Sequence, residues 1–263
     1  VEENISHAIP LVERAIEQGA ELVATPEMTN IITSDRGELL AQICTEDQDP
    51  MLEALKTLAE KHSVSLLIGS LALKTTEGDI VNRSLLIGSD GQIEARYDKI
   101  HMFDASLGSG ENYRESNLYK AGSQAVVADT PWGGLGMSIC YDLRFPHLYR
   151  HLASAGAHML SVPAAFTQVT GSAHWYVLLR ARAIETGCFV FAPGQCGHHG
   201  HGRTTYGHSL IVDPWGEVLG CLGDEPGVLI GKLDFMRVNE VRQRLPSLEH
   251  GREFKEVPDK WKD

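Results

Sequence analysis

Residues 134–164 read GLGMSICYDLRFPHLYRHLASAGAHMLSVPA, two short apolar runs with a helical segment between them. The runs 134–139 and 157–164 have the length of buried strands, and apolar residues at helical spacing predict a helix over 145–156. A strand, a helix and a second strand in this order are typical of a parallel sheet covered by helices. The segment therefore predicts an α/β fold with Cys140 at the end of its first strand.

The rest of the chain continues this alternation. Its apolar patterns predict helices over 2–19, 49–63, 172–187 and 234–245, strands over 21–25, 64–73, 80–89, 92–99, 125–130 and 188–194, hairpin strands within 204–220 and 227–234, and an irregular segment over 104–123. The runs LLIG, MLSV and CFVF lack a polar face, which indicates strands covered on both sides. We therefore expect two sheets packed face to face with helices outside. Because no low-complexity linker interrupts the pattern, we expect a single domain over residues 1–263.

The composition excludes several classes of protein. A net charge of −12 argues against a nucleic-acid partner, which would need a basic face. No run of about eighteen apolar residues predicts a membrane span, and the charged residues 1–20 do not resemble a secretory leader. Five cysteines form an odd set without a CxxC pair, which favours free thiols in a reducing, cytoplasmic setting over a disulfide framework or a zinc site.

Three chemically able side chains, Glu27, Lys99 and Cys140, each follow a predicted strand. Each has an ordinary alternative, because strand ends also carry solvated carboxylates, surface lysines and packed thiols. Together they form a workable reaction centre in which Cys140 attacks as a thiolate after Glu27 takes its proton. Lys99 and the backbone N–H of Tyr141 would then hold the oxyanion. A nearby cation and a nearby helix N-terminus lead us to expect a lowered thiol pKa.

Three segments resemble, in order, the catalytic blocks of the nitrilase (carbon–nitrogen hydrolase) superfamily: LVATPEMTN, YDKIHMFD and GMSICYDLRFP. AHWYVLLRARAIET and YGHSLIVDPWGEVLG resemble the later helix and hairpin of that family. The resemblance implies a four-layer αββα sandwich with Glu27 as base, Lys99 as oxyanion stabiliser and Cys140 as nucleophile. It also implies a second active-site glutamate, placed by NYRES at Glu115, which orients Lys99. The implied reaction releases ammonia from an amide through a Cys140 thioester, without a cofactor or a metal.

The stretch QCGHHGHGRTTYGHS is similar to the branch of the superfamily that hydrolyses deaminated glutathione. That branch implies an anionic amide as the small-molecule substrate, for which Arg144 and Arg203 are candidate cations. Each arginine has a structural ion pair as its alternative. His174 and Trp175 are expected to open the helix over 172–187, either as a wall of the pocket or as an oligomer contact, with capping and packing as the alternative.

Three rival functions remain open at this stage. The chain could be an ω-amidase or an N-carbamoyl amide hydrolase with the same thioester chemistry. It could also be a non-catalytic scaffold on the same fold, which the intact set of Glu27, Lys99, Glu115 and Cys140 disfavours. The resemblance further implies a homodimer or a larger homo-oligomer.

Other features are departures from the family pattern or local expectations. The family begins with a strand ahead of the first helix, which this sequence lacks, so we expect an open edge beside the 21–25 strand. His147 stands where the family usually has glutamate.

The histidine-rich segment 198–201 has glycine-rich, irregular spacing, which favours a loop over a metal site. We expect Asp142 and Arg144 to form an ion pair that braces the turn after Cys140.

Overall fold

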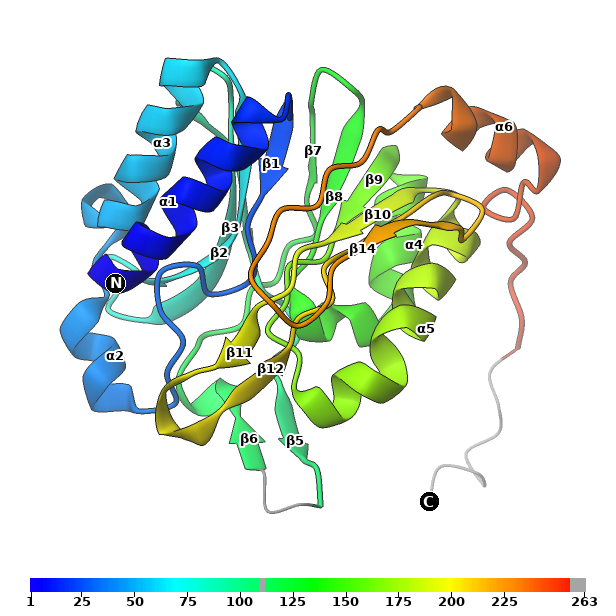
Figure 1. Cartoon of the computed structure of the whole chain (residues 1–263). Coiled ribbons are helices and arrows are strands. Elements are labelled where there is room, and N and C mark those ends of the chain that lie inside the picture. The colour runs from blue at the N-terminus through cyan, green and yellow to red at the C-terminus, as the bar shows by residue number, and fades with distance from the viewer. Residues whose placement is uncertain (109–111, 256–263) are drawn as a thin grey trace.

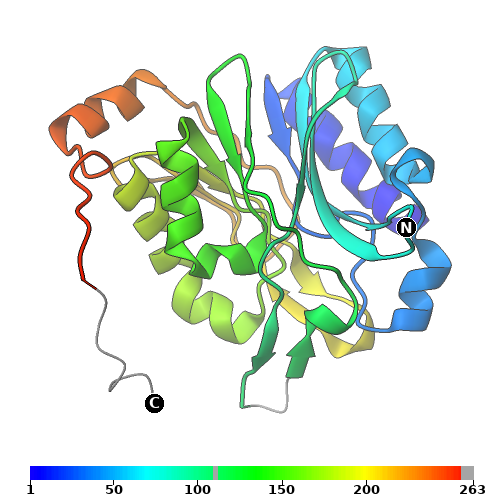
Figure 2. The same cartoon turned by 180° about the vertical axis from the view of Figure 1, so that it is seen from behind.

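The computed structural model describes residues 1–108 and 112–255, which fold into two central sheets with helices on both outer sides (Figure 1). Helices α1 (Glu2–Glu17) and α3 (Pro50–His62) cover a four-stranded sheet. A six-stranded sheet packs behind it, and α4 (Pro146–Ser154) and α5 (Gln168–Thr186) cover its far side. Figure 2 shows the same layers from behind. The predicted αββα sandwich is confirmed.

The four-stranded sheet has the order β1-β2-β3-β4. Its strands are β1 (Leu22–Ala24), β2 (Ser65–Lys74), β3 (Ile80–Ile87) and β4 (Ile93–Asp98), with β1 parallel to β2 and the remaining pairs antiparallel. Both faces of β2 are buried: Leu66 and Ile68 pack with the helices, and Leu67 packs with the core between the sheets. Because neither face of β2 meets water, this strand needs no polar face, which explains its nearly continuous apolar sequence.

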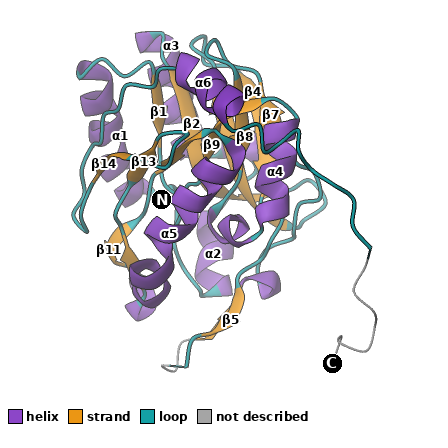
Figure 3. Cartoon of the chain, turned by 90° about the vertical axis from the view of Figure 1, so that its right-hand side faces the viewer, coloured by secondary structure: helices purple, strands orange, loops and turns teal. Residues whose placement is uncertain are grey.

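The six-stranded sheet has the order β14-β13-β10-β9-β8-β7. Its strands are β7 (Val127–Ala128), β8 (Gly134–Met137), β9 (Ala157–Ser161), β10 (Phe189–Ala192), β13 (Leu210–Val212) and β14 (Val218–Cys221). Strands β8, β9 and β10 are parallel, so their carboxyl ends meet at one edge. Figure 3 shows α4 and α5 in front of this sheet.

Two hairpins, two further helices and four short 3-10 turns complete the described chain. They are β5 (Asp104–Ser106) with β6 (Asn112–Arg114), β11 (Cys196–His198) with β12 (Thr204–Tyr206), α2 (Arg36–Gln42), α6 (Met236–Arg244), η1 (Glu46–Gln48), η2 (Glu115–Asn117), η3 (Cys140–Arg144) and η4 (Gly200–Gly202). Within the described ranges, no helix has both the length and the apolar character needed to cross a membrane.

Several sequence expectations are corrected by the structure. The segment 227–234 forms no strand; it packs through side chains, with Leu229 against Gly220 and Ile211 against Gly231. The segment 104–123 was expected to be irregular, yet β5 pairs with β6 within it. The pattern also did not predict α2, whose first turn is capped by the Asp35 carboxylate.

The longest helix begins earlier than predicted. Thr167 caps α5, and its side-chain oxygen accepts a hydrogen bond from the Thr170 N–H at 3.3 Å. His174 and Trp175 therefore lie in the second turn of α5 rather than opening it. The helix predicted over 145–156 is confirmed as α4 (Pro146–Ser154), and the short helix η3, which was not predicted, precedes it and begins at Cys140 itself.

Candidate active site

The structure brings Glu27, Lys99 and Glu115 into one hydrogen-bonded cluster. Glu27 follows β1, Lys99 follows β4 and Glu115 opens η2. The Lys99 Nζ donates to Glu27 Oε1 at 2.8 Å and to Glu115 Oε1 and Oε2 at 2.9 and 2.8 Å. Segments separated by up to 88 positions along the chain thus meet around one ammonium group.

Burial makes this ion cluster tight. Lys99 is 2% exposed and Glu27 is 3% exposed, so neither charge has much contact with water. Burial alone would lower the pKa of Lys99, but the charges of Glu115 and Glu27 outweigh it and raise that pKa well above its ordinary value. Burial likewise raises the pKa of Glu27, but the charge and hydrogen bond of Lys99 outweigh it, and the net pKa is lowered. The pair is therefore an ammonium and a carboxylate at neutral pH.

Cys140 stands in a strained backbone conformation beside this cluster. Its φ is +49°, a left-handed value that non-glycine residues rarely adopt, and its N–H donates to the Pro163 carbonyl at 2.9 Å. The Glu27 carboxylate is close enough to the thiol for its charge to act on the pKa of the sulfur. Burial and the negative charge of Glu27 raise the thiol pKa well above its ordinary value, although the Lys99 charge acts against them. The expected lowering of this pKa is therefore wrong, because a buried carboxylate adjoins the sulfur.

Asp142 holds the turn that carries Cys140. Its fully buried carboxylate accepts hydrogen bonds from the Tyr97 hydroxyl at 2.7 Å, from the Ile139 N–H at 2.8 Å and from the His101 N–H at 3.1 Å. Tyr97 belongs to β4, so this carboxylate ties the turn after β8 to the other sheet. Cys140 and Lys99 are thereby held in a fixed relation.

The predicted ion pair between Asp142 and Arg144 is wrong. The described partners of Asp142 are Tyr97, His101 and Ile139, which occupy its two oxygens. The Arg144 side chain turns the other way: its guanidinium lies 5.8 Å from the Tyr141 ring and 5.4 Å from the Phe166 ring, and its Nη1 is 3.2 Å from His174 Nδ1. Arg144 is therefore held by rings and an imidazole rather than by a carboxylate.

The backbone around Glu27 fixes its carboxylate from several sides. Glu27 Oε2 accepts a hydrogen bond from the Ala165 N–H at 2.8 Å, and the Gln195 side chain donates to the Glu27 carbonyl at 3.0 Å. Gly69 on β2 packs against the backbone just before Glu27. A Cβ at Gly69 would lie only 2.0 Å from the Thr25 carbonyl oxygen, so only glycine allows this close approach.

Sequence reasoning missed Asn82, which contacts both glutamates. Its Nδ2 donates to Glu27 Oε1 at 3.0 Å and to Glu115 Oε1 at 3.3 Å. Asn82 lies on β3 and is buried. In the sequence, Asn82 is distinguished only as a single amide after two apolar residues in IVNRSLLI. A polar residue at such a position is also expected from the ordinary alternation of a strand, so it did not indicate a site.

The four predicted substrate-binding residues lie at different depths. Arg203 donates from Nη2 to the Ala165 carbonyl at 3.0 Å, and its guanidinium is 5.8 Å from the Tyr113 ring. Arg144 and His174 contact each other near the surface. Trp175 is 1% exposed, packs 4.8 Å from Phe166 and donates its indole N–H to the His208 carbonyl, so it has the packing position that was its alternative.

The histidine-rich segment 198–201 is held by ordinary hydrogen bonds. His199 Nε2 lies 2.7 Å from the Thr205 hydroxyl, and His201 Nε2 lies 2.9 Å from Glu38 Oε2. Over the ranges 1–108 and 112–255, no group of three or more histidine, cysteine, aspartate or glutamate side chains is placed to hold a metal ion. His147 lies edge-on to the rings of His101 and Phe145.

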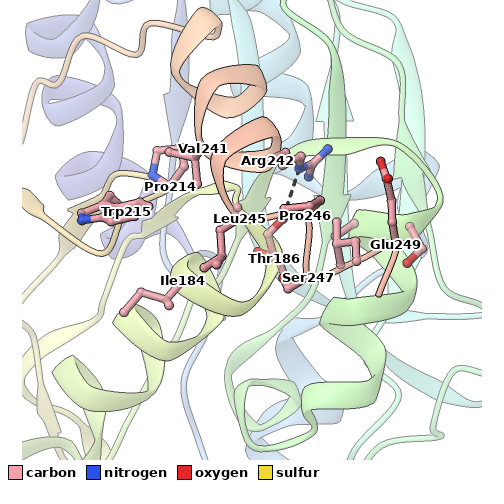
Figure 4. Close-up of a pocket in the computed structure, with 14 residues that line it drawn as sticks. Ile184, Thr186, Pro214, Trp215, Val241, Arg242, Leu245, Pro246, Ser247 and Glu249 are labelled. Atoms are coloured by element: carbon pink, nitrogen blue, oxygen red, sulfur yellow. Dashed lines mark hydrogen bonds between the residues drawn. The ribbon is translucent and has the colours of Figure 1, made fainter. Parts of the chain in front are cut away.

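A separate cavity of about 350 Å³ lies on the outer side of the molecule, between the end of α5, α6 and the segment that follows α6 (Figure 4). Ile184, Trp215 and Leu245 line it, and Arg242 donates to the Thr186 carbonyl at 3.2 Å beside it. None of the four candidate catalytic residues lines this cavity. The cavity therefore belongs to a different surface from the ion cluster.

Comparisons with known proteins identify the family of this chain. The family model described as carbon-nitrogen hydrolase matches residues 1–243. A Synechocystis protein named deaminated glutathione amidase is 42% identical over 94% of this chain and 92% of its own length. The crystal structure of the Caenorhabditis elegans NitFhit protein has a TM-score of 0.87 and 39% identity, and covers 95% of this chain and 61% of its own.

A third relative bears on the cysteine. A mutant of the amidase from Nesterenkonia sp., with a TM-score of 0.76 and 28% identity over 93% of this chain and 92% of its own, shows acrylamide added to its active-site cysteine. The family match covers more than nine-tenths of this chain, and the match to the Synechocystis protein has a similar extent. Fold, sequence and the arrangement of ionisable groups thus lead to one conclusion: the chain belongs to the carbon–nitrogen hydrolase family.

Proposed function

We propose that this chain is an amidase that hydrolyses deaminated glutathione through a thioester on Cys140. The observation that carries the proposal is the buried cluster in which Lys99 bonds to Glu27 and Glu115 while the charge of Glu27 acts on the Cys140 thiol. This arrangement supplies a nucleophile, a base and an oxyanion-binding cation in one buried cluster.

The raised thiol pKa determines how the first step proceeds. Because the resting sulfur is protonated, its proton passes to Glu27 as the sulfur attacks the carbonyl carbon of the amide. The carbonyl oxygen becomes an oxyanion, which receives hydrogen bonds from the Lys99 ammonium and the Tyr141 N–H. The first backbone hydrogen bond of η3 runs from the Asp142 N–H to the Ile139 carbonyl. The N–H of Tyr141, one residue earlier, is not part of that bond, as is usual for the first N–H groups of a helix.

The second half of the reaction uses the same groups in reverse. Glu27 gives its proton to the nitrogen, the C–N bond breaks and ammonia leaves, which forms the thioester on Cys140. Glu27 then takes a proton from a water molecule as that water attacks the thioester carbonyl. The carboxylic acid is released and the thiol regains its proton. Glu115 keeps Lys99 aimed at the oxyanion throughout.

Replacement of the nucleophile tests this chemistry. Cys140→Ala should release no ammonia from deaminated glutathione while it unfolds at the same temperature as the wild type within a few degrees, because the sulfur makes the bond to the substrate. Ammonia release and thermal unfolding measure the two effects, and intact mass after rapid quenching detects an acyl adduct. Cys188→Ala, which removes a buried thiol outside the cluster, is the control for activity. Wild-type turnover by Cys140→Ala, or an acyl adduct on it, would contradict the assignment.

The pKa of the thiol gives a second prediction, in which a change that stops catalysis makes the sulfur more reactive. In Glu27→Gln the anion beside the sulfur is lost and the Lys99 ammonium remains, so the thiol pKa falls. The rate of Cys140 alkylation by iodoacetamide should therefore reach its plateau at lower pH than in the wild type, while amide turnover is lost. Peptide mapping assigns the alkylated thiol.

The matched control for this change is Glu38→Gln, an exposed carboxylate that contacts Thr33 and His201. It should leave the alkylation profile of Cys140 unchanged. A Glu27→Gln profile that coincides with the wild type, or that moves to higher pH, would show that Glu27 does not act on the sulfur as described.

The proposed substrate rests on the relatives and on local cations. The Synechocystis relative is named for deaminated glutathione, an anionic molecule, whereas this chain has a net charge of −12. An acidic protein needs cations close to its site to hold such an anion. Two observations support Arg203 in this role: it hydrogen-bonds to Ala165 beside Glu27, and among the described atoms its buried Nε has no hydrogen-bond partner. Arg144 lies nearer the surface, over Tyr141.

Arg203→Leu should raise KM for deaminated glutathione by about tenfold or more, since a hydrogen bond to a charged group contributes roughly 1.5–3 kcal/mol. Turnover of an uncharged amide such as propionamide should keep its KM, which separates carboxylate binding from general damage. Equal effects on both substrates would contradict the role. An ammonia-release comparison with α-ketoglutaramate and carbamoyl amino acids tests the rival functions, and a preference for either would replace the proposed substrate.

The proposal extends to assembly and location. The chain forms a homodimer or larger homo-oligomer, which is supported by apolar side chains exposed on α5 and beside it, among them Val177, Ile184 and Trp215. It works as one domain, since α4, α5 and both sheets contribute to a common core. A cytoplasmic location is supported by its five free cysteines.

A further inference from the structure

Asn82 makes three contacts to the ion cluster, more than a buried strand residue needs for its own hydrogen bonding. Its side-chain Nδ2 donates to Glu27 Oε1 at 3.0 Å and to Glu115 Oε1 at 3.3 Å. Its backbone carbonyl accepts from the Lys99 N–H at 3.0 Å. One residue of β3 thus touches all three charged members of the cluster.

The orientation of the Asn82 amide follows from its neighbours. Rotation of the amide by half a turn would place its oxygen against two carboxylate oxygens, where acceptor would face acceptor. In the observed orientation both N–H groups are used, and the Oδ1 is buried without a hydrogen-bond partner among the described atoms. A strand position occupied only for stability would not favour an unpaired buried carbonyl. The two carboxylates explain why an amide stands here.

The two oxygens of the Glu27 carboxylate have different hydrogen-bond partners. Oε1 accepts from both Lys99 and Asn82, whereas Oε2 accepts from the Ala165 N–H. A carboxylate oxygen has two strong acceptor directions, so Oε2 retains one for a further donor. We propose that Asn82 is a positioning residue that fixes Glu27 and Glu115 on either side of Lys99 and leaves Glu27 Oε2 as the oxygen that takes the Cys140 proton.

This inference rests on the proposed function, because it assigns Asn82 a role in the proton transfer from Cys140 to Glu27. Asn82 is a neutral donor, so it holds two carboxylates without adding a charge that would compete with Lys99. A second cation at this position would attract the same carboxylates, but it would also lower the pKa of Glu27 further and make it a weaker base. A donor bond to a carboxylate lowers its pKa, so Asn82 also helps keep Glu27 ionised.

The variant Asn82→Leu removes both donors and keeps the branched shape and the number of heavy atoms of the side chain. We expect kcat to fall by tenfold or more with KM changed less than twofold, since in this proposal Asn82 acts through Glu27 and Glu115 rather than on the substrate. The acidic limb of the kcat/KM profile, which reports the ionisation of the cluster in the free enzyme, should move to higher pH because a hydrogen bond to the carboxylates is lost. Steady-state ammonia release across the pH range measures both effects.

Ser84→Ala is the matched control. Ser84 lies two residues further along β3, is fully buried and donates to the Ile68 carbonyl at 3.0 Å, but has no described contact with Glu27 or Glu115. It should lower stability without shifting the acidic limb. Asn82→Ser, which keeps one donor and decides the question if Asn82→Leu does not fold, should give a smaller shift than full loss of the donors.

The outcomes separate this inference from the proposed function. If Cys140→Ala is inactive while Asn82→Leu and Asn82→Ser keep the wild-type kcat and acidic limb, the positioning role is wrong and the proposed function stands. The same limb shift in Ser84→Ala would also overturn the role, because it would then be a general effect of damage to β3. Full activity in Cys140→Ala would overturn both.

Discussion

The Lys99 ammonium, buried between the carboxylates of Glu27 and Glu115, constrains every other group in the candidate site. A buried cation is tolerated only when opposite charges and hydrogen bonds replace its hydration. Here those partners come from the turn after β1 and from η2, while Lys99 itself follows β4, so the cluster joins the two edge strands of the first sheet to a segment outside it. The same charges raise the pKa of Lys99 and lower that of Glu27, which keeps a base ready beside a protonated thiol. Fold and chemistry therefore depend on one interaction.

The second constraint is the attachment of the nucleophile to this cluster across the two sheets. Cys140 is carried by the six-stranded sheet, whereas Lys99 follows the four-stranded one. Asp142 joins them through Tyr97 and the His101 N–H, and it does so without exposure to water. The backbone of Cys140 adopts a strained, left-handed conformation where the two sheets are joined in this way. Such strain persists only where the surrounding contacts determine the conformation, as the Asp142 contacts do.

Sequence patterns predicted the layers well, because strands with two buried faces are largely apolar and lack a polar face, as in β2. They failed at 227–234, where an apolar run packs through side chains without a ladder partner, since pairing depends on a neighbour that the run does not encode. Strand ends pointed to Glu27, Lys99 and Cys140. Asn82 was missed because it lies inside a strand. The sign of the thiol pKa shift was wrong because it depends on burial and on a carboxylate 113 positions away in the chain.

The most direct test of the account is the unfolding free energy of charge-cluster variants, measured in urea near neutral pH. Lys99→Met leaves two carboxylates facing each other in a buried site, and we expect it to lower stability by about 3–5 kcal/mol. Lys99→Met combined with Glu27→Gln and Glu115→Gln removes all three charges, and this triple variant should recover most of that loss. A triple variant less stable than Lys99→Met alone, with the three losses simply adding, would contradict the claim that these charges hold one another in place.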